Sequence, residues 1–322
     1  MQTEEQIFLQ NVFLGNYIAR RDEARKNDLS FVHYTTAENA LRILKTKEFW
    51  LRRASIMNDY SEIQYGENCI AYAINIHQIK INQILNDIRP DLAKKIGNLI
   101  DEQLVEAKQH TFIGSFAEHD SNEKSHDNQF GRLSMWRAYG GSAGAAMVLR
   151  RESFFNEGSQ SSGVFISPVH YCTVEQFAPE FLKMFEKVEA NKDKLKEMDE
   201  PQLIALFSFS LLYAILSTKH RGFEEEKEWR LIYSTPISQS KHVQITNETI
   251  QGVPQRVCRF PLKNSRSLGI NKVEIPELLE RLIVGPCKFP MDIYDAFVSQ
   301  LAEADVPEAY KKVHCSFIPI RT

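Results

Sequence analysis

The sequence has no long apolar run. None of its hydrophobic stretches approaches the roughly 20 residues that a helix needs to cross a bilayer. Its most apolar segment, LIALFSFSLLYAIL at 203–216, is shorter and contains two serines, so it predicts a helix of the protein core. The first residues, MQTEEQIFLQ, lack the basic start and apolar middle of a signal peptide. We therefore expect a cytoplasmic protein that does not bind membranes.

Paired cysteines are also absent. The five cysteines form no C-x-x-C motif, and no histidine lies near them at a spacing typical of metal ligands. Such a pattern is typical of reduced thiols packed in the protein, so we expect neither disulfides nor a zinc site. The cysteines are Cys69, Cys172, Cys258, Cys287 and Cys315.

An excess of positive charge is a third feature that the chain lacks. Its 39 basic and 42 acidic side chains give a net charge of -3, which argues against a protein that coats nucleic acids or lies on a membrane surface. A local basic cleft is still allowed. The length of 322 residues and the hydrophobic content of 43% suit one large globular domain.

The stretch 31–59 contains most of the chemistry that the sequence suggests. It predicts a strand, a helix that Thr36 caps and that ends near Lys47, and a second strand at 49–51. His33 then lies where a strand meets the N-terminus of a helix, a position from which it can bond a sugar or a phosphate. The alternative is a structural histidine, which is the more common case for a single histidine at a strand end.

The remaining periodicities alternate between helices and short strands. They predict an α+β fold with a mixed, mostly antiparallel sheet. We expect an N-terminal helix in 1–30 and an α+β domain over 31–290 with helical insertions at about 60–110 and 175–220. A helix and strand in 291–322 complete the same domain. The N-terminal helix is amphipathic and packs on the domain or on a second copy, so a homodimer is allowed.

Two acidic residues stand out at the start of a predicted strand. Glu226 and Glu228 are two positions apart, so in an extended chain both carboxylates point to the same side. Crowded carboxylates raise each other's pKa, which lets one bond a hydroxyl while the other stabilises positive charge. Acidic residues at such places are more often surface residues, and Glu228 could also be an ion-pair partner of Arg230, Arg137 or His220.

Glycines and aromatic residues surround these positions. The run GGSAG at 140–144 follows Trp136 and Tyr139 and precedes a strand, so it is neither a Walker loop nor a dinucleotide fingerprint. We expect it to let the backbone approach a neighbouring strand or a flat ligand. The three tryptophans, Trp50, Trp136 and Trp229, all lie beside polar residues, where they could stack on a ligand or fill the core.

The order of several short motifs resembles a bacterial family of unknown function, DUF2971. The similarity covers roughly residues 30–290, and its family name implies no activity. The motifs are HYT at 33–35, Asn58 with Asp59, SF-x-E at 115–118, MW-x-x-YG at 135–140, KH at 219–220 before EKEWRL at 226–231, and LIVGP at 282–286.

A more distant similarity is to the ADP-ribosyltransferase fold, whose members release nicotinamide from NAD. It rests on the strand-His-x-Thr-helix opening, an aromatic middle and a later Glu-x-Glu. This resemblance implies NAD as substrate, an ADP-ribosyltransferase-like fold and no metal. The implied catalytic residues are Glu228, with Glu226 and His33 assisting. The implied NAD-binding residues are His33, Tyr34, Thr35, Asn58, Ser115, Trp136, Arg137 and Tyr139, with Tyr34 or Tyr139 and Trp136 beside the nicotinamide ring.

Three functional hypotheses follow. The first is an NAD-consuming ADP-ribosyltransferase, acting as a toxin or in defence against phage on an acceptor, protein or nucleic acid, that the sequence does not identify. The second is a non-catalytic module of the same fold that binds a nucleotide or a nucleic-acid end, with Arg52, Arg53 and Arg137 beside His33. The third is a metal-dependent nuclease using Asp59, Glu118, Glu226 and Glu228, which fits no known nuclease spacing.

Overall fold

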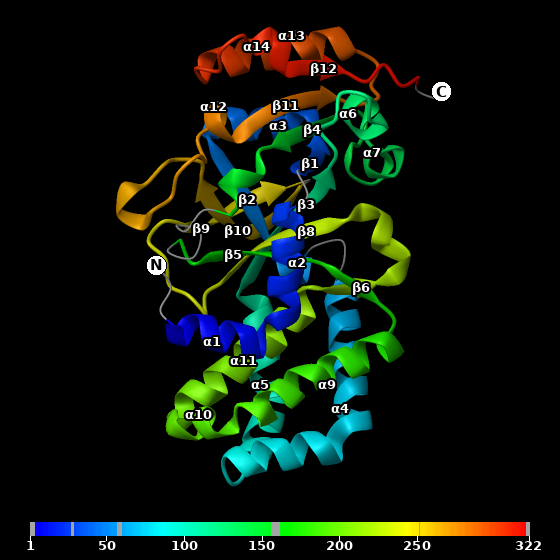
Figure 1. Cartoon of the computed structure of the whole chain (residues 1–322). Helices are drawn as coiled ribbons and strands as arrows, with labels where there is room; N and C mark the ends of the chain where they lie inside the picture. Colours follow the sequence, from blue (N-terminus) through cyan, green and yellow to red (C-terminus); the bar gives the residue numbers. More distant parts are fainter. Residues whose placement is uncertain (1–3, 27–28, 57–59, 156–161, 251, 320–322) are drawn as a thin grey trace.

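The computed structural model describes residues 4–26, 29–56, 60–155, 162–250 and 252–319. It has the predicted α+β architecture, in which a mixed, mostly antiparallel sheet is covered by helices (Figure 1). The five helices α4, α5, α9, α10 and α11 form a layer at the lower end of Figure 1, and α13 and α14 lie at the upper end. Among the described residues, no helix is both long and apolar enough to cross a membrane.

The strands are short. They are β1 (Ser30–Thr36), β2 (Glu48–Arg53), β3 (Thr111–His119), β4 (Gly144–Leu149), β5 (Val164–Pro168), β6 (His170–Cys172), β7 (Thr218–His220), β8 (Glu228–Ser234), β9 (Gln244–Ile250), β10 (Val253–Pro261), β11 (Leu279–Val284) and β12 (Val313–Cys315).

The helices vary more in length. They are α1 (Glu4–Phe13), α2 (Gly15–Lys26), α3 (Ala37–Thr46), α4 (Tyr60–Ile88), α5 (Leu92–Gln109), α6 (His126–Phe130), α7 (Leu133–Tyr139), α9 (Val174–Ala190), α10 (Lys192–Glu197), α11 (Glu200–Leu216), α12 (Ile275–Leu278), α13 (Pro290–Glu303) and α14 (Ala309–Lys312). The single N-terminal helix predicted from the sequence is two helices, because the chain bends at Leu14.

The helix and the second strand predicted in 31–59 are present, whereas the first strand, β1, continues to Thr36 and so places His33 in its middle and not at its end. The Thr36 hydroxyl accepts a hydrogen bond from the backbone N–H of Asn39 at 3.2 Å and so caps α3. The helix ends at Lys47, which is in the left-handed conformation. Helix α3 therefore connects β1 to β2 as a short crossover, and the side chains at the end of β1 face its first turn.

The main sheet has ten strands and divides at β3. Eight strands follow the order β12-β11-β4-β1-β3-β2-β10-β9, and β8 pairs with both β3 and β5. Residues 111–117 of β3 pair with β8 on one edge, whereas the other edge pairs with β1 at 117–119 and with β2 at 112–113. Residues 114–116 therefore have no strand partner on that second edge. The sheet is split there, with β1 and β4 on one side and β2 and β10 on the other.

Alternation along the strands sorts the polar candidates onto two faces. His33 shares a face with Phe31 and Phe116, and this His33 face packs in the core beneath α3 and α13. Ser115 shares the other face with Glu228 and lies opposite Arg230 in the register of β3 and β8. This Glu228 face packs against the helical layer, because Ile113 and Ile232 on it belong to the core of α4, α9 and α11.

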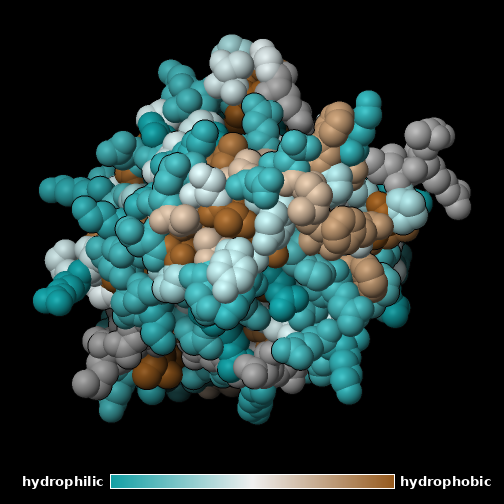
Figure 2. Space-filling model, turned by 90° about the horizontal axis from the view of Figure 1, so that it is seen from above, coloured by the Kyte–Doolittle hydropathy of each residue, from teal (hydrophilic) through white to brown (hydrophobic). Residues whose placement is uncertain are grey.

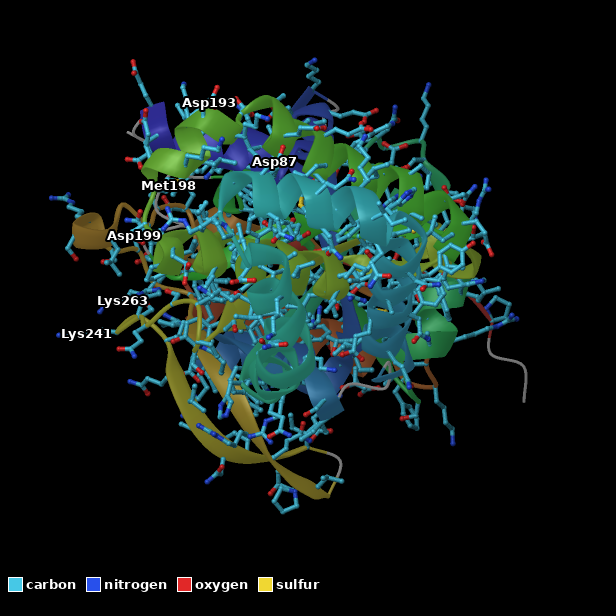
Figure 3. All side chains as sticks on the ribbon, turned by 90° about the horizontal axis from the view of Figure 1, so that it is seen from below. Asp87, Asp193, Met198, Asp199, Lys241 and Lys263 are labelled. Atoms are coloured by element: carbon cyan, nitrogen blue, oxygen red, sulfur yellow. The ribbon has the colours of Figure 1, made fainter. Side chains whose placement is uncertain are left out.

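The outer surfaces are mostly polar. Viewed from above, hydrophilic side chains cover much of the C-terminal layer, with apolar groups between them (Figure 2). The large apolar side chains exposed in this part of the chain are Phe289, Met291, Tyr310 and Phe317. Viewed from below, charged side chains such as Asp87 and Asp193 cover the outside of the helical layer (Figure 3).

Candidate functional site

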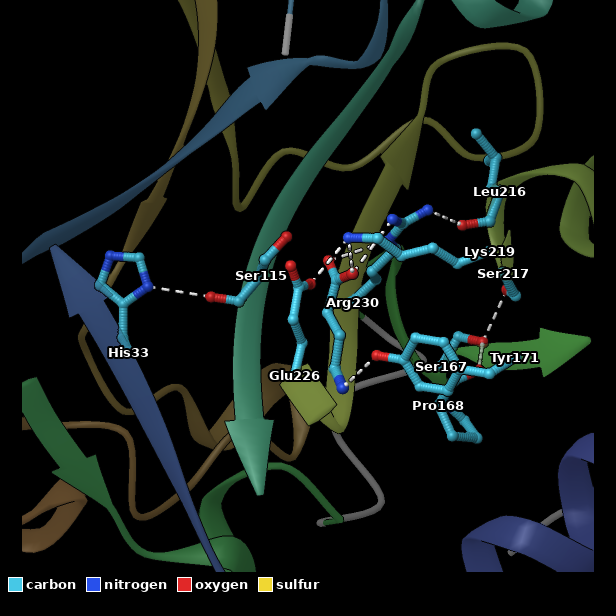
Figure 4. Close-up of polar contacts among 11 residues, drawn as sticks. His33, Ser115, Ser167, Pro168, Tyr171, Leu216, Ser217, Lys219, Glu226 and Arg230 are labelled. Atoms are coloured by element: carbon cyan, nitrogen blue, oxygen red, sulfur yellow. Dashed lines mark hydrogen bonds and ion pairs between the residues drawn. The ribbon is translucent and has the colours of Figure 1, made fainter. Parts of the chain in front are cut away.

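His33 lies in the split of the sheet. Its Nδ1 atom is 2.9 Å from the backbone oxygen of Ser115, which is among the β3 residues that lack a strand partner on this edge (Figure 4). A carbonyl oxygen only accepts, so Nδ1 carries the proton and donates it. The imidazole thus provides a hydrogen bond to the Ser115 carbonyl, which has no strand partner on this edge of β3. Its ring packs edge-on against Phe49 and, at a tilt, against Phe116, with centroids 4.8 and 5.6 Å away.

The second nitrogen of His33 is an acceptor. Burial lowers the pKa of His33 to about 4, the bond to Ser115 opposes this shift, and the charge of Arg42 adds to it. The ring is therefore neutral at pH 7, and because Nδ1 holds the proton, Nε2 has a free lone pair. Among the described residues, no group donates a hydrogen bond to Nε2.

Arg42 is the neighbour that sequence reasoning missed. Its Nε and Nη2 atoms donate to the Asn39 side chain at 3.0 and 2.6 Å, and Asn39 donates to the Thr35 hydroxyl at 2.7 Å. The guanidinium lies 3.5 Å from the centroid of the Trp50 ring, and burial lowers the pKa of Arg42 to about 10. Its Nη1 atom is buried and has no hydrogen-bond partner among the described residues.

A pattern in the sequence could have indicated this residue. Asn39 and Arg42 are three positions apart on the first turns of α3, so they share the helix face that begins beside Thr35. The local chain Thr35–Asn39–Arg42 therefore follows from helical spacing alone. The Trp50 ring that holds the guanidinium comes from β2, and only the crossover brings it there.

Glu228 lies in a different environment, a buried network of four charges. Its two carboxylate oxygens accept from Arg230 Nε and Nη2 at 3.0 and 3.1 Å. Lys219 Nζ is 3.4 Å from Glu228 and 2.7 Å from Glu226. The side chains of Glu228, Arg230 and Lys219 are only 7%, 4% and 1% exposed, whereas that of Glu226 is 18% exposed.

The network keeps the Glu228 carboxylate ionised at neutral pH. Burial raises the pKa of this carboxyl, but the charges of Arg230 and Lys219 and the hydrogen bonds from Arg230 outweigh burial and lower the pKa to about 2. Its backbone N–H donates to the Tyr171 hydroxyl at 2.7 Å, and Arg230 donates onward to the backbone oxygen of Leu216 at 2.7 Å. These bonds tie β8 to β6 and to the end of α11. The alternative considered from the sequence, an ion pair with Arg230, is what the structure contains.

His33 and Glu228 do not line one cavity. The register of β1, β3 and β8 puts them on opposite faces of the sheet. His33 is on the same face as Phe31, whereas Glu228 lies opposite Ala117, which pairs with Val32 and so is on the other face. The predicted arrangement, in which both groups meet one ligand, is therefore wrong. Ser115 lies between them, because its carbonyl accepts from His33 (Figure 4) while its side chain is on the Glu228 face, where the hydroxyl has no hydrogen-bond partner among the described residues.

Trp136 and Tyr34 are core residues. They meet edge to face with centroids 4.9 Å apart, on the sheet face away from His33, and Trp136 is 4% exposed. The indole N–H donates to the backbone oxygen of Phe130 at 2.8 Å, and the Tyr34 hydroxyl accepts from the backbone N–H of Arg132 at 2.9 Å. The prediction that these rings flank nicotinamide beside His33 is wrong, because the sheet separates them from it.

The glycines around Trp136 explain the GGSAG run. A Cβ atom at Gly144 would lie 2.9 Å from the indole, and one at Gly285 would lie 2.7 Å from it. The flat group that the backbone approaches is thus the indole of Trp136. The motifs MW-x-x-YG and LIVGP meet at this ring, which accounts for both of them as structural elements.

The other predicted residues are dispersed. Thr35 lies in the His33 cluster, Arg137 is exposed on α7, and Tyr139 packs partly buried against the Trp136 cluster. Asn58 and Asp59 lie outside the described residues. Glu118, a member of the predicted nuclease set, accepts from the Trp229 indole at 3.0 Å. Within the described ranges, no three His, Cys, Asp or Glu side chains are grouped to hold a metal ion.

A comparison with family models supports the motif-based assignment. Residues 135–231 match the family described as "Protein of unknown function (DUF2971)". The matched range contains both the Trp136 motif and the Glu228 network. No curated protein matches the chain. No solved structure matches it either.

Proposed function

We propose that the protein binds a nucleotide at the split of the sheet, as a non-catalytic module. The observation that carries this proposal is a hydrogen-bond acceptor and a hydrogen-bond donor that have no partner among the described residues. His33 Nε2 accepts, Arg42 Nη1 donates, and no described residue uses either atom. Arg42 lies close enough to His33 for its charge to lower the pKa of the imidazole.

Such a pair suits a sugar with a phosphate. A ribose hydroxyl donates to Nε2, and the guanidinium donates to a phosphate or ribose oxygen. Arg42 is held between the Asn39 amide and the Trp50 ring, so little side-chain entropy is lost when it binds. The neutral imidazole is the form that accepts, and its lowered pKa maintains that form well below pH 7.

The non-catalytic character rests on the Glu228 network. A catalytic carboxylate must reach the reacting bond, whereas both oxygens of Glu228 are bonded to Arg230 and lie on the other face. Releasing it would leave two buried cations with a single carboxylate. We therefore assign the ligand-binding role to His33 and Arg42 and a structural role to Glu228.

Calorimetric titration with ADP-ribose and NAD tests the proposal. We expect both to bind, and we expect His33→Phe and Arg42→Gln each to weaken binding about tenfold or more, because each removes a hydrogen bond to a buried group. Arg137→Gln is the matched control, since this arginine is exposed and lies away from the split. Absence of binding of either ligand to the folded wild-type protein would refute the proposal.

ADP-ribosyl transfer from NAD is a second candidate. The observation in its favour is Ser115, whose carbonyl accepts from His33 and whose side chain lies on the Glu228 face, opposite Arg230. An enzyme of this kind would act as a toxin or an anti-phage effector on a protein or nucleic-acid acceptor. Its test is nicotinamide release from NAD. Release that disappears in Glu228→Gln, while this variant still binds ADP-ribose, would replace the binding module by the transferase.

A further inference from the structure

A cavity lies between the N-terminal helices and the helical layer. It has a volume of about 110 Å³, is lined mainly by α1, α2, α9 and α11, and is partly open to solvent. Beside it, between β6, α9 and the turn after β7, is an open hollow of about 660 Å³. The two spaces share the side chains of Arg20, His170, Glu180 and Lys183. Together they form one pocket. The open hollow is its entrance, and the cavity among the helices is its inner end.

The inner end of the pocket is apolar and aromatic. Its walls include the rings of Phe13, Phe177, Phe181 and Tyr213, and Phe177 stacks on Phe181 with centroids 5.5 Å apart. The hydroxyls nearby are already used. The Tyr213 hydroxyl donates to Ser167, and Ser210 donates to the backbone oxygen of Leu206 at 2.9 Å. This end therefore suits a ring or another apolar group.

The entrance carries more positive than negative charge. Arg20 and Lys183 lie where the two spaces meet, Lys187 lines the inner space, and Arg221 lines the outer one. Two carboxylates face them. Glu180 is 3.3 Å from His170, and Glu224 is 3.5 Å from Arg221.

His170 adds no charge of its own. Burial lowers its pKa to about 4, and the charge of Arg20 lowers it further. The imidazole is therefore neutral at pH 7, with its Nε2 atom 3.3 Å from a carboxylate oxygen of Glu180. Arg221 is paired with Glu224, and the remaining three cations, Arg20, Lys183 and Lys187, outnumber Glu180 among the described residues that line the two spaces.

We propose that this pocket binds an aromatic anion, with the ring in the inner end and the anionic group between Arg20 and Lys183. The site is separate from the split at His33 and takes a different ligand class. Burial of the ring supplies hydrophobic free energy, and the two cations fix the orientation of the anion.

Titration with phenyl phosphate, monitored by calorimetry at low salt, tests the inference. We expect binding that inorganic phosphate does not reproduce at tenfold higher concentration, because phosphate lacks the ring. Arg20→Gln and Lys183→Gln should each raise the Kd about tenfold, the effect of losing one charge-assisted bond. Ala214→Leu should block binding, because Ala214 lines the cavity and the larger side chain fills it.

Lys263→Gln is the matched control. This lysine is exposed and lies at the left edge of the view from below (Figure 3). His33→Phe should also leave phenyl phosphate binding unchanged, which separates this site from the nucleotide site. Circular dichroism and thermal unfolding establish that each variant is folded. Equal binding by phenyl phosphate and phosphate, or undiminished binding in folded Ala214→Leu, would overturn the inference.

Discussion

The two polar clusters on either side of β3 differ in how much of their bonding capacity is already used. At Glu228 both oxygens are paired with Arg230, and Lys219 adds a second cation. At His33 one ring nitrogen is bonded, whereas the other ring nitrogen and the Nη1 atom of Arg42 have no hydrogen-bond partner within the described ranges. A fully paired cluster holds elements together, whereas a partly paired one retains groups that can recognise a ligand.

The largest expected effect is on stability at Glu228. Glu228→Gln leaves Lys219 and Arg230 buried with Glu226 as their remaining carboxylate, so the free energy of unfolding should fall by about 3–5 kcal/mol. Urea denaturation measures it. Glu224→Gln is the control, because that carboxylate is exposed and should change stability by less than about 0.5 kcal/mol. An equally small effect of Glu228→Gln would remove the contrast between the clusters.

The second expected effect is on pH dependence. The folded pKa of His33 is about 4, below its ordinary 6.5, so between these values the unfolded chain binds a proton that the folded chain refuses. The free energy of unfolding should therefore fall by up to about 3 kcal/mol as the pH drops from 6.5 to 4. Glu228 acts in a lower window, since its contribution is lost as the pH falls from 4.5 towards 2.

Comparing wild type with His33→Phe isolates the first of these windows. His170 also has a lowered pKa, but it titrates in both proteins and cancels in the difference. Urea denaturation between pH 7 and pH 4 should show a shallower decline for the variant. Parallel profiles would mean that the His33 imidazole is not desolvated in the folded protein.

The smallest expected effect concerns the glycines that pack against the Trp136 indole. Gly285→Ala places a Cβ atom 2.7 Å from the indole, so the core must shift and the free energy of unfolding should fall by about 1–3 kcal/mol. The control, Gly97→Ala, has open space around the added atom within α5 and should stabilise the helix by about 0.5–1 kcal/mol. Changes of the same sign in both variants would contradict the role assigned to the ring.

Local features of the site were predictable from the sequence. The cap at Thr36 and the helix end near Lys47 depend on neighbours a few residues away. The prediction that His33 lies at the end of a strand was wrong, because β1 continues to Thr36 and places His33 in its middle. Glu226 and Glu228 both contact Lys219, but not for the predicted reason. Glu226 ends a 3-10 helix and Lys227 is left-handed, so the two glutamates do not lie on one extended strand. The pairing of Glu228 with Arg230, two positions along the same strand, was among the alternatives because it is local.

The sequence by itself determined the fold class and the short-range geometry, because hydrophobic period, capping and turn residues act within a few positions. Only the tertiary structure decided which side of the sheet each polar group faces. A shift of one residue in the pairing of β1, β3 and β8 reverses every side chain, and that pairing joins segments more than 80 residues apart. The separation of His33 from Glu228, the burial of Trp136 and the recruitment of Trp50 beside Arg42 all follow from that long-range register.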